Sequence, residues 1–527
     1  MRRPDALRRI VGAVSSGLLY AGAQPGTGLW PLGFACFVPL LWAWRCAPLR
    51  ERVGLAWIAG TVATTLATVE AGSTGASTYF GLGPLGSLGF ALGIGQVFGA
   101  ASFVAMALLA GDPLASNGRV ASLRFGAAVA GAELLRGTLL TGFPWLLLAY
   151  SLLPAPELTG AAAYGGPVLV SLLLAWTNAE LAAAVLAPRR RTWAAAAAAA
   201  ACSLLAVPGL LGAPARDGTV QLADGDEPAA DALRLLLLQP GARAEEQPQS
   251  PAGAVAGLIR QTTEAPSFDV AVWPENALPA FLPANAHLVR PALAHRPDAR
   301  LILGAPRAEP TAPGTLYTSA LLLDSDARTL AHHDKVHLLP FAEYAPGPLP
   351  MRWFGALEAT AGARPLPLAD DGAVFGPLIC YEVLFAELAR QQARSAGILL
   401  NLSNDSWFGR AGASEQHLAA AMYRAVETAR PVLRSTQTGI TAAIDARGRV
   451  VARLPMNEAG RLLVDVVPGS GTTWALAWGS APAWVAFGLV LLRSLPFRRA
   501  AARLRPRRRR RSPGAAPAPG RAGSVRG

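Results

Sequence analysis

Apolar residues dominate positions 7–211 of this 527-residue chain and return near its end, and this distribution restricts the fold more than any other feature. A helix needs about 20 predominantly apolar residues to cross a bilayer. Stretches of this character cover residues 9–25, 27–44, 54–72, 85–110, 124–150, 162–187, 192–211 and 474–495. The sequence therefore predicts a polytopic α-helical membrane domain with about eight transmembrane helices.

Arginines alternate between the loops that join these stretches. They precede the first stretch and lie in every second loop after it, at Arg2, Arg3, Arg8, Arg9, Arg45, Arg50, Arg52, Arg119, Arg124 and Arg189 to Arg191. The intervening loops 24–27, 73–84 and 151–161 contain no Lys or Arg. Because positively charged loops stay in the cytoplasm, we expect a multi-pass protein of the bacterial inner membrane with both termini cytoplasmic. The segment between the seventh and eighth stretches is then periplasmic or otherwise extracytoplasmic.

The first stretch has two interpretations. Arginines precede an apolar run that ends in small residues at Ala21 and Ala23, which is also typical of a cleavable signal peptide. Further apolar stretches follow closely, and this favours a retained signal anchor.

The positive charge of the chain is concentrated in its last segment. The formal net charge is +13, and residues 493–527 contain twelve arginines and no acidic residue. Subtracting these arginines leaves about +1 for the rest of the chain. This distribution indicates a basic tail at the cytoplasmic membrane face, and we expect no nucleic-acid partner.

The region between the seventh and eighth stretches has the pattern of an α/β protein. Strand-like apolar runs cover 233–239, 269–275, 300–306, 319–324 and 397–403, and residues 414–430 have helical periodicity. Strands that alternate with helices over about 250 residues predict one layered α/β domain.

These observations divide the chain into four parts. Residues 1–211 are expected to form a membrane domain with seven transmembrane helices, and residues 212–472 a periplasmic α/β domain. Residues 473–496 are expected to form the eighth transmembrane helix. Residues 497–527 are expected to be a basic, disordered cytoplasmic tail.

Three polar positions of the α/β region follow apolar runs, where such domains expose functional side chains. They are Glu275, Cys380, and Lys335 with Glu343. A carboxylate can accept a thiol proton, and a lysine can stabilise the oxyanion formed when the thiolate attacks a carbonyl group. Glu, Lys and Cys together therefore suffice for acyl transfer through a thioester.

Each position also has a structural interpretation. A lone cysteine such as Cys380 is often a buried apolar residue, and Glu275 is suited to capping the helix after it. Lys335 lies in a polar stretch typical of a solvated loop. The histidines His332, His333 and His337 resemble metal ligands, but no second His/Cys cluster accompanies them, and surface histidines are the favoured interpretation. We therefore expect no metal or cofactor.

Two ionisable residues lie within the fifth apolar stretch. Glu133 and Arg136 are three residues apart and share a helix face. Such residues are functional candidates inside a membrane, but a structural ion pair that fixes helix packing is favoured over a lipid-headgroup site.

The motifs WPENALP (273–279), DKVHLLPFAEY (334–344) and ICYE (379–382) resemble the nitrilase superfamily of Glu-Lys-Cys amidases and acyltransferases. The eight apolar stretches, the segment 135–150 and the motif SNDSWFG (403–409) are similar to bacterial apolipoprotein N-acyltransferases. The resemblance extends to about residue 495. It implies a nitrilase-like α-β-β-α sandwich seated on the membrane helices.

The resemblance also implies roles for individual residues. Glu275 is the implied general base, Cys380 the nucleophile and Lys335 the oxyanion stabiliser. Glu343 supports this triad, while Tyr381 and Glu382 shape the site beside the nucleophile, and the Tyr381 N–H contributes to the oxyanion hole. The family often has a tryptophan after the first strand of the outer domain, and residues 237–249 lack one.

The implied reaction is a ping-pong transfer. An acyl chain passes from a membrane phospholipid, expected to be phosphatidylethanolamine, to Cys380 and then to the N-terminal α-amine of a diacylglyceryl-cysteine apolipoprotein. The enzyme is expected to be a monomer. The alternatives are a membrane-tethered nitrilase-type amidase that hydrolyses a small amide with the same triad, and a non-catalytic scaffold.

Overall fold

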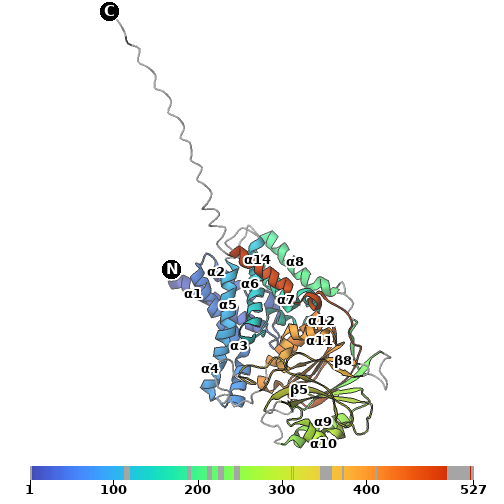
Figure 1. Ribbon diagram of the computed structural model, residues 1–527. Coiled ribbons are helices and arrows are strands. Elements are labelled where there is room, and N and C mark those ends of the chain that lie inside the picture. The colour runs from blue at the N-terminus through green and yellow to red at the C-terminus, as the bar shows by residue number, and fades with distance from the viewer. Residues whose placement is uncertain are drawn as a thin grey trace, which may run out of the picture.

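The computed structural model describes residues 3–111, 119–186, 191–210, 217–223, 231–241, 250–309, 311, 314–344, 359–370, 373–409, 412–494 and 523. Helices gather at one end of the molecule and two β-sheets at the other (Figure 1). The expected tail 497–527 lies outside the described residues apart from Gly523, and so do residues 242–249 of the segment 237–249.

The helical part is built from segments that correspond to the apolar stretches. Its helices are α1 (Arg3–Ala23), α2 (Val38–Trp44), α3 (Leu49–Phe80), α4 (Pro84–Ile94), α5 (Ala101–Ala110), α6 (Arg119–Thr138), α7 (Ala162–Leu186), α8 (Arg191–Leu210), α13 (Trp474–Trp478) and α14 (Ala481–Ser494). Among the described residues, three helices are long and apolar enough to cross a membrane, namely Leu49–Thr78, Pro84–Ala110 and Ala162–Leu186.

The expected continuous stretch 27–44 is wrong as a single helix. A short 3₁₀ helix at Trp30–Phe34 is separated from α2, which has a proline at its start. Asn178 of α7 satisfies the interrupted backbone, because its Oδ1 accepts from Phe37 N at 2.8 Å and its Nδ2 donates to Gly33 O at 2.9 Å. The stretch 474–495 is likewise interrupted at Gly479, whose φ is 60°.

The stretch 124–150 is helical only as far as Thr138, with a 3₁₀ turn to Thr141, so the expectation of one helix is wrong there too. Gly142 has a φ of 84°, and Pro144 disfavours helical geometry in the residue before it. The chain then runs as an irregular segment to a second 3₁₀ helix at Leu148–Leu152. We call residues 139–147 the post-α6 segment.

Glu133 and Arg136 hold this post-α6 segment in place. Glu133 Oε1 accepts from Leu148 N at 2.8 Å, and Arg136 Nη2 donates to Leu146 O at 3.0 Å. Tyr20 OH of α1 donates to the same carbonyl at 2.7 Å. Both ionisable residues therefore form hydrogen bonds with backbone groups of the non-helical chain that follows α6. This supports a structural role, although through the backbone and not through the expected ion pair.

The α/β part contains two sheets in the described part of the chain. The first has the order β1 (Val220–Leu222), β13 (Gly460–Val466), β2 (Leu233–Gln239), β3 (Val270–Val272), β4 (Arg300–Ala308), β5 (Leu316–Leu323), β6 (Thr329–Asp334). The second has the order β12 (Val450–Arg453), β11 (Ala442–Ile444), β10 (Val432–Thr436), β9 (Ile398–Ser403), β8 (Ala373–Ile379), β7 (Leu368–Asp370). Strands β2–β3–β4 and β8–β9–β10 are parallel.

Side-chain alternation along the strands produces the layers. In β2, Leu235 and Leu237 pack against the other sheet, whereas Leu236 and Leu238 pack beneath α9 (Pro251–Thr263). Helix α10 (Leu282–Val289) lies beside α9, and α11 (Ala386–Ala393) and α12 (Ala413–Thr428) cover the second sheet (Figure 1). The expected α-β-β-α sandwich is confirmed.

Helix α12 joins the two parts of the molecule. Almost all of its side chains are buried, because one face covers the second sheet and the other packs on the helical part. Tyr423 OH donates to Ala149 O at 2.7 Å. The second sheet, which carries Cys380 at the end of β8, therefore lies nearer the helices than the first (Figure 1).

A buried ion pair stabilises the first sheet at a distance in sequence of 231 residues. Arg234 Nε lies 2.8 Å from Asp465 Oδ1, and both side chains are almost inaccessible. We expect Asp465→Ala to lower the free energy of unfolding by about 3–5 kcal/mol, because it removes the carboxylate that accepts two hydrogen bonds from the buried Arg234 guanidinium. Thermal unfolding of the purified protein measures this.

The control is Glu415→Ala, which removes the partner of the half-exposed Arg453. We expect that change to lower the free energy of unfolding by about 1 kcal/mol or less. Equal shifts in the two unfolding midpoints would contradict the importance of the buried pair.

Candidate active site

Loops after β3, β6 and β8 bring Glu275, Lys335 and Cys380 together. Lys335 Nζ lies 3.1 Å from Glu275 Oε1 and 2.9 Å from Glu343 Oε1. Cys380 borders the same cavity and interacts with Glu275. The exposed fractions of Glu275, Lys335 and Cys380 are 7%, 2% and 5%. Lys335 is therefore not a solvated residue. Glu275 does not cap the helix that follows it, because the N-cap of α10 is Phe281.

Backbone contacts fix the two carboxylates that flank the lysine. Asn404 N donates to Glu275 Oε2 at 2.9 Å, and Leu339 N donates to Glu343 Oε2 at 2.7 Å. Each carboxylate therefore presents its other oxygen to Lys335.

The surroundings of Cys380, Glu275 and Lys335 shift the pKa of each group. Burial and the Glu275 carboxylate raise the pKa of the Cys380 thiol to about 12, against the opposing effect of Lys335. Burial also raises the pKa of the Glu275 carboxyl, which Lys335 opposes. Burial disfavours the charge of Lys335, but Glu275 and Glu343 outweigh it and raise the pKa of the ammonium group. The resting site therefore holds a protonated thiol beside a lysine cation at neutral pH.

Cys380 begins a 3₁₀ turn, Cys380–Leu384, with a left-handed φ of 49°. This conformation costs about 1–3 kcal/mol in a residue other than glycine, so the surrounding structure must hold it. The sharp turn presents the Cys380 side chain at the end of β8.

Glu382 organises the loops around the cysteine. Its carboxylate accepts from Ile379 N at 2.7 Å, Val336 N at 2.6 Å and His337 N at 3.1 Å. Burial opposes its ionisation, but His333 and these N–H donors outweigh burial and lower the pKa of the carboxyl. Glu382 therefore links the turn after β8 to the loop that carries Lys335.

The three histidines differ in environment. His333 is buried and its Nε2 lies 3.3 Å from Glu382 Oε2, so the interpretation as a surface residue is wrong for His333. His337 Nε2 lies 2.9 Å from Thr141 O of the post-α6 segment. His332 is partly exposed, near Asp334. No group of three or more metal-ligating side chains occurs among the residues that the structure describes.

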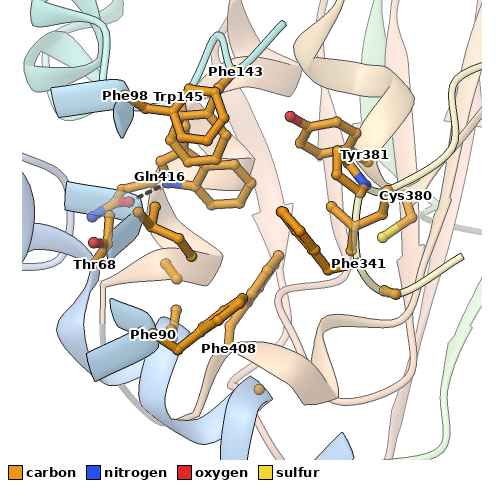
Figure 2. A pocket seen from close by; sticks show the side chains of 18 of the residues that line it. Thr68, Phe90, Phe98, Phe143, Trp145, Phe341, Cys380, Tyr381, Phe408 and Gln416 are labelled. Carbon is orange, nitrogen blue, oxygen red and sulfur yellow. Dashed lines mark hydrogen bonds between the residues drawn. The ribbon is translucent and has the colours of Figure 1, made fainter. Parts of the chain in front are cut away.

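An apolar cavity of about 170 Å³ reaches Cys380 from the side of the helices. Figure 2 shows Cys380 and Tyr381 on one side of it and the aromatic rings of Phe98, Phe143 and Trp145 on another. Tyr381 OH donates to Gly142 O at 3.0 Å, which fixes the post-α6 segment against the site. Residues of α3 and α4 complete the wall.

A second, more polar cavity of about 450 Å³ meets the first at Cys380. Its lining includes Glu275, Lys335, Glu343, Tyr317, Thr318 and Asn404. The cysteine therefore lies where an apolar space and a polar space meet.

Sequence patterns indicated the charged residues but not most of the apolar wall. Phe341 belongs to the motif DKVHLLPFAEY and Phe408 to SNDSWFG, so their motifs were the only signal for them. Phe98, Phe143 and Trp145 lie in apolar stretches, where an aromatic residue of a cavity looks the same as one that faces lipid.

The raised pKa of Cys380 predicts a distinctive pH dependence of its reactivity. With a pKa of about 12, the thiolate fraction at pH 8 is on the order of 10⁻⁴. We therefore expect the rate of alkylation by iodoacetamide to rise from about pH 7 to pH 10 without a plateau, since each increase in pH only enlarges a small thiolate fraction. Mass spectrometry of the Cys380 peptide measures the rate, with the exposed Cys46 as an internal reference. A plateau below about pH 9 would mean that a thiolate–lysine ion pair is already formed at rest.

Two family profiles match this chain. The family profile described as apolipoprotein N-acyltransferase N-terminal domain matches residues 16–180, and the profile described as carbon-nitrogen hydrolase matches residues 245–476. A solved amidase from Nesterenkonia sp. is 21% identical with a TM-score of 0.36, covering 46% of this chain and 92% of the amidase.

Curated relatives match along most of the chain. The apolipoprotein N-acyltransferase of Brucella melitensis biotype 1 is 31% identical over 527 residues, covering 92% of this chain and 94% of the relative. That of Caulobacter vibrioides is 34% identical over 504 residues, covering 87% and 89%. With this identity over nearly its whole length, the chain belongs to the apolipoprotein N-acyltransferase family.

Proposed function

We propose that the protein transfers an acyl chain from a membrane phospholipid to the N-terminal α-amine of a diacylglyceryl-cysteine apolipoprotein, through a thioester on Cys380. Membership of the apolipoprotein N-acyltransferase family assigns it to lipoprotein N-acylation. The observation that carries the detailed proposal is the apolar cavity that ends at Cys380, beside the buried Glu275 and Lys335.

The first half-reaction forms the thioester. Cys380 Sγ attacks the ester carbonyl of the phospholipid while its proton passes to Glu275, so a free thiolate need not accumulate. The Lys335 ammonium and the Tyr381 N–H stabilise the oxyanion. Collapse of the tetrahedral intermediate breaks the bond to the glycerol oxygen, which takes the proton from Glu275 and leaves as lysophospholipid.

The second half-reaction transfers the acyl group. The neutral α-amine of the acceptor attacks the thioester carbonyl, and Glu275 accepts a proton from the attacking nitrogen. Collapse forms the amide and expels the sulfur of Cys380, which recovers the proton from Glu275. The polar cavity supports this step, because it gives an amine a route to Cys380 past Glu275 and Glu343.

The composition of the apolar cavity favours a lipid donor over a small amide. Burial of each methylene group in such a space contributes about 0.8 kcal/mol, which a small polar amide cannot obtain. Aromatic rings of Phe98, Phe143 and Trp145, together with α3 and α4, enclose a space suited to an acyl chain. The amidase alternative uses the same triad and leaves this space without a role.

Supporting roles follow from the contacts of three neighbours. We assign Glu343 to the orientation of Lys335, Glu382 to the geometry of the turn at Cys380, and Tyr381 to both the oxyanion and the cavity wall. Intact contacts at all these positions disfavour the non-catalytic scaffold.

We also propose the donor headgroup and the oligomeric state of the enzyme. Phosphatidylethanolamine is the proposed donor, because the carboxylate of Glu343 beside the polar cavity suits a headgroup that carries an ammonium group. A monomer is proposed because one chain supplies Glu275, Lys335 and Cys380. No metal or cofactor enters the reaction as written.

The four-part division of the chain and its orientation also belong to this proposal. We propose about eight membrane segments, formed by α1, the 3₁₀ helix with α2, α3, α4 with α5, α6, α7, α8, and α13 with α14. Residues 212–472 are then periplasmic, 473–496 form the last segment and 497–527 a cytoplasmic tail. The alternation of arginine-bearing loops supports this orientation.

Mass spectrometry of the purified enzyme tests the proposed chemistry. We expect incubation with phospholipid to add one acyl chain to the Cys380 peptide, and a diacylglyceryl-cysteine lipopeptide with an unblocked amine to discharge it. Cys380→Ser should abolish the adduct without altering membrane insertion. An N-acetylated lipopeptide is the control, because it has no attacking amine. Absence of any adduct would contradict the transferase, and discharge by water alone would favour the hydrolase.

Cysteine labelling tests the orientation. The exposed Cys46 lies next to Arg45 in a loop that we expect to be cytoplasmic. A membrane-impermeant maleimide should therefore leave Cys46 unlabelled in intact spheroplasts and label it after lysis. The matched site is the exposed Asp326 of the α/β part, where Asp326→Cys should be labelled in both samples. The reverse pattern would show the opposite orientation.

A further inference from the structure

A buried charged cluster contacts the backbone of Cys380. Asp405 follows β9, His417 belongs to α12 and Arg434 to β10, and all three side chains are almost completely inaccessible. Arg434 Nη2 lies 2.5 Å from Asp405 Oδ2 and 3.0 Å from His417 Nδ1. His417 Nε2 lies 3.1 Å from the carbonyl oxygen of Cys380. None of the three side chains enters the proposed reaction, so the cluster needs a separate explanation.

The contacts determine the proton arrangement of His417. A carbonyl oxygen only accepts hydrogen bonds, so Nε2 carries a proton and donates to Cys380. Burial and the Arg434 guanidinium disfavour a second proton on Nδ1 and lower the pKa of the imidazole, although Asp405 acts in the opposite direction. His417 is therefore a neutral N–H donor whose Nδ1 accepts from Arg434.

This donor acts on the peptide plane that follows the nucleophile. The Cys380 carbonyl and the Tyr381 N–H belong to one planar trans peptide group and point in opposite directions. A hydrogen bond that fixes the carbonyl therefore also fixes the N–H that we assign to the oxyanion. The same bond helps to hold the left-handed φ of 49° at Cys380.

Aromatic side chains hold the imidazole in position. Trp145 stacks on His417 with ring centroids 5.5 Å apart, and Phe408 contacts it edge-on at 5.5 Å. Trp145 Nε1 also donates to Gln416 Oε1 at 2.5 Å. Trp145 and Phe408 also line the apolar cavity. The imidazole of His417 therefore lies between the cavity wall and the backbone of Cys380.

We propose that His417 is a positioning residue, which holds the Cys380–Tyr381 peptide group through its Nε2–H so that the thiol and the oxyanion donor are aligned for attack. The inference rests on the proposed function. It excludes His417 as a general base, because its protonated Nε2 faces the carbonyl and its Nδ1 faces Arg434 and Asp405.

The pair His417→Gln and His417→Asn tests this role. The amide nitrogen of glutamine occupies a place near Nε2 and can still donate to Cys380, whereas the shorter asparagine amide lies near Nδ1 and cannot. We expect His417→Asn to lower kcat for acyl-enzyme formation about 100-fold, since a small misplacement of reacting groups has effects of this size. His417→Gln should stay within about five-fold, and KM for phospholipid should change in neither variant.

Thermal unfolding of both variants distinguishes alignment from stability. If His417 only stabilised the Asp405–Arg434 pair, asparagine would be the better replacement, and its equal or higher activity would overturn the proposal. The dependence of kcat on pH gives a further test. If His417→Gln removed one of its ionisations, His417 would be acting as a proton acceptor, and the proposal would be overturned. An unsubstituted enzyme that forms no acyl adduct would instead overturn the proposed function, and this inference with it.

A second variant keeps the test independent of how the histidine variants fold. Asn401 Nδ2 also donates to Cys380 O, at 3.4 Å, and its Oδ1 accepts from Arg434. Asn401→Asp retains an acceptor for Arg434 and removes that N–H. We expect a fall of about three- to ten-fold in kcat for acyl-enzyme formation, and an unchanged kcat would overturn the proposal.

Discussion

The Lys335 ammonium lies between two carboxylates in a site almost closed to water, and the remaining geometry of the site depends on this arrangement. A buried cation is tolerated only when partners and hydrogen bonds replace its lost hydration. Glu275 and Glu343 supply the partners at 3.1 Å and 2.9 Å, and backbone N–H groups of Asn404 and Leu339 orient them. The paired charges thereby connect the loops after β3, β6 and β9. Glu382 then adds the turn that bears Cys380.

The site lies against the helical part, and this position favours a substrate with a lipid acyl chain. The post-α6 segment contacts His337 and Tyr381, and Tyr423 of α12 contacts Ala149. These contacts join the α/β part to the helical part around an apolar cavity. An acyl chain that stays in an apolar environment avoids a transfer through water of about 0.8 kcal/mol for each methylene group. A thioester at Cys380, as proposed, would keep its acyl chain in the apolar cavity and avoid this cost.

Sequence patterns predict the layers of the sandwich better than its edges. The continuous apolar run 233–239 predicts a strand buried on both faces, and β2 is indeed covered by α9 on one face and by the second sheet on the other. The polar residues just before Lys335 belong to a stretch typical of a solvated loop, but they form the end of the edge strand β6. An edge strand pairs on one side only, so its sequence need not be apolar. The stretch 124–150 is predominantly apolar, but only its first part is helical. An irregular segment that is buried in protein can have side chains as apolar as those of a membrane helix, so composition does not distinguish the two.

Residues of the candidate site were predictable where a local motif surrounds them. Glu275, Lys335 and Cys380 each lie in such a motif, and the structure brings them together. His417 lies in a helix whose periodicity resembles that of any packed helix, and it contacts Cys380 over a separation of 37 residues. That contact arises from the packing of α12 on β10 and on the 3₁₀ turn Cys380–Leu384, which no local pattern records. For the same reason the aromatic wall of the cavity was visible only in three dimensions.

The central claim is that a lipid acyl chain occupies the apolar cavity while it is bound to Cys380. A structure of the enzyme trapped as its thioester, before any acceptor amine is added, tests it most directly. We predict continuous density from Cys380 Sγ into the space between Phe98, Trp145 and Phe341, which α3 and α4 also line. A chain that runs through the polar cavity past Tyr317, or a thioester with the apolar cavity unfilled, would contradict it.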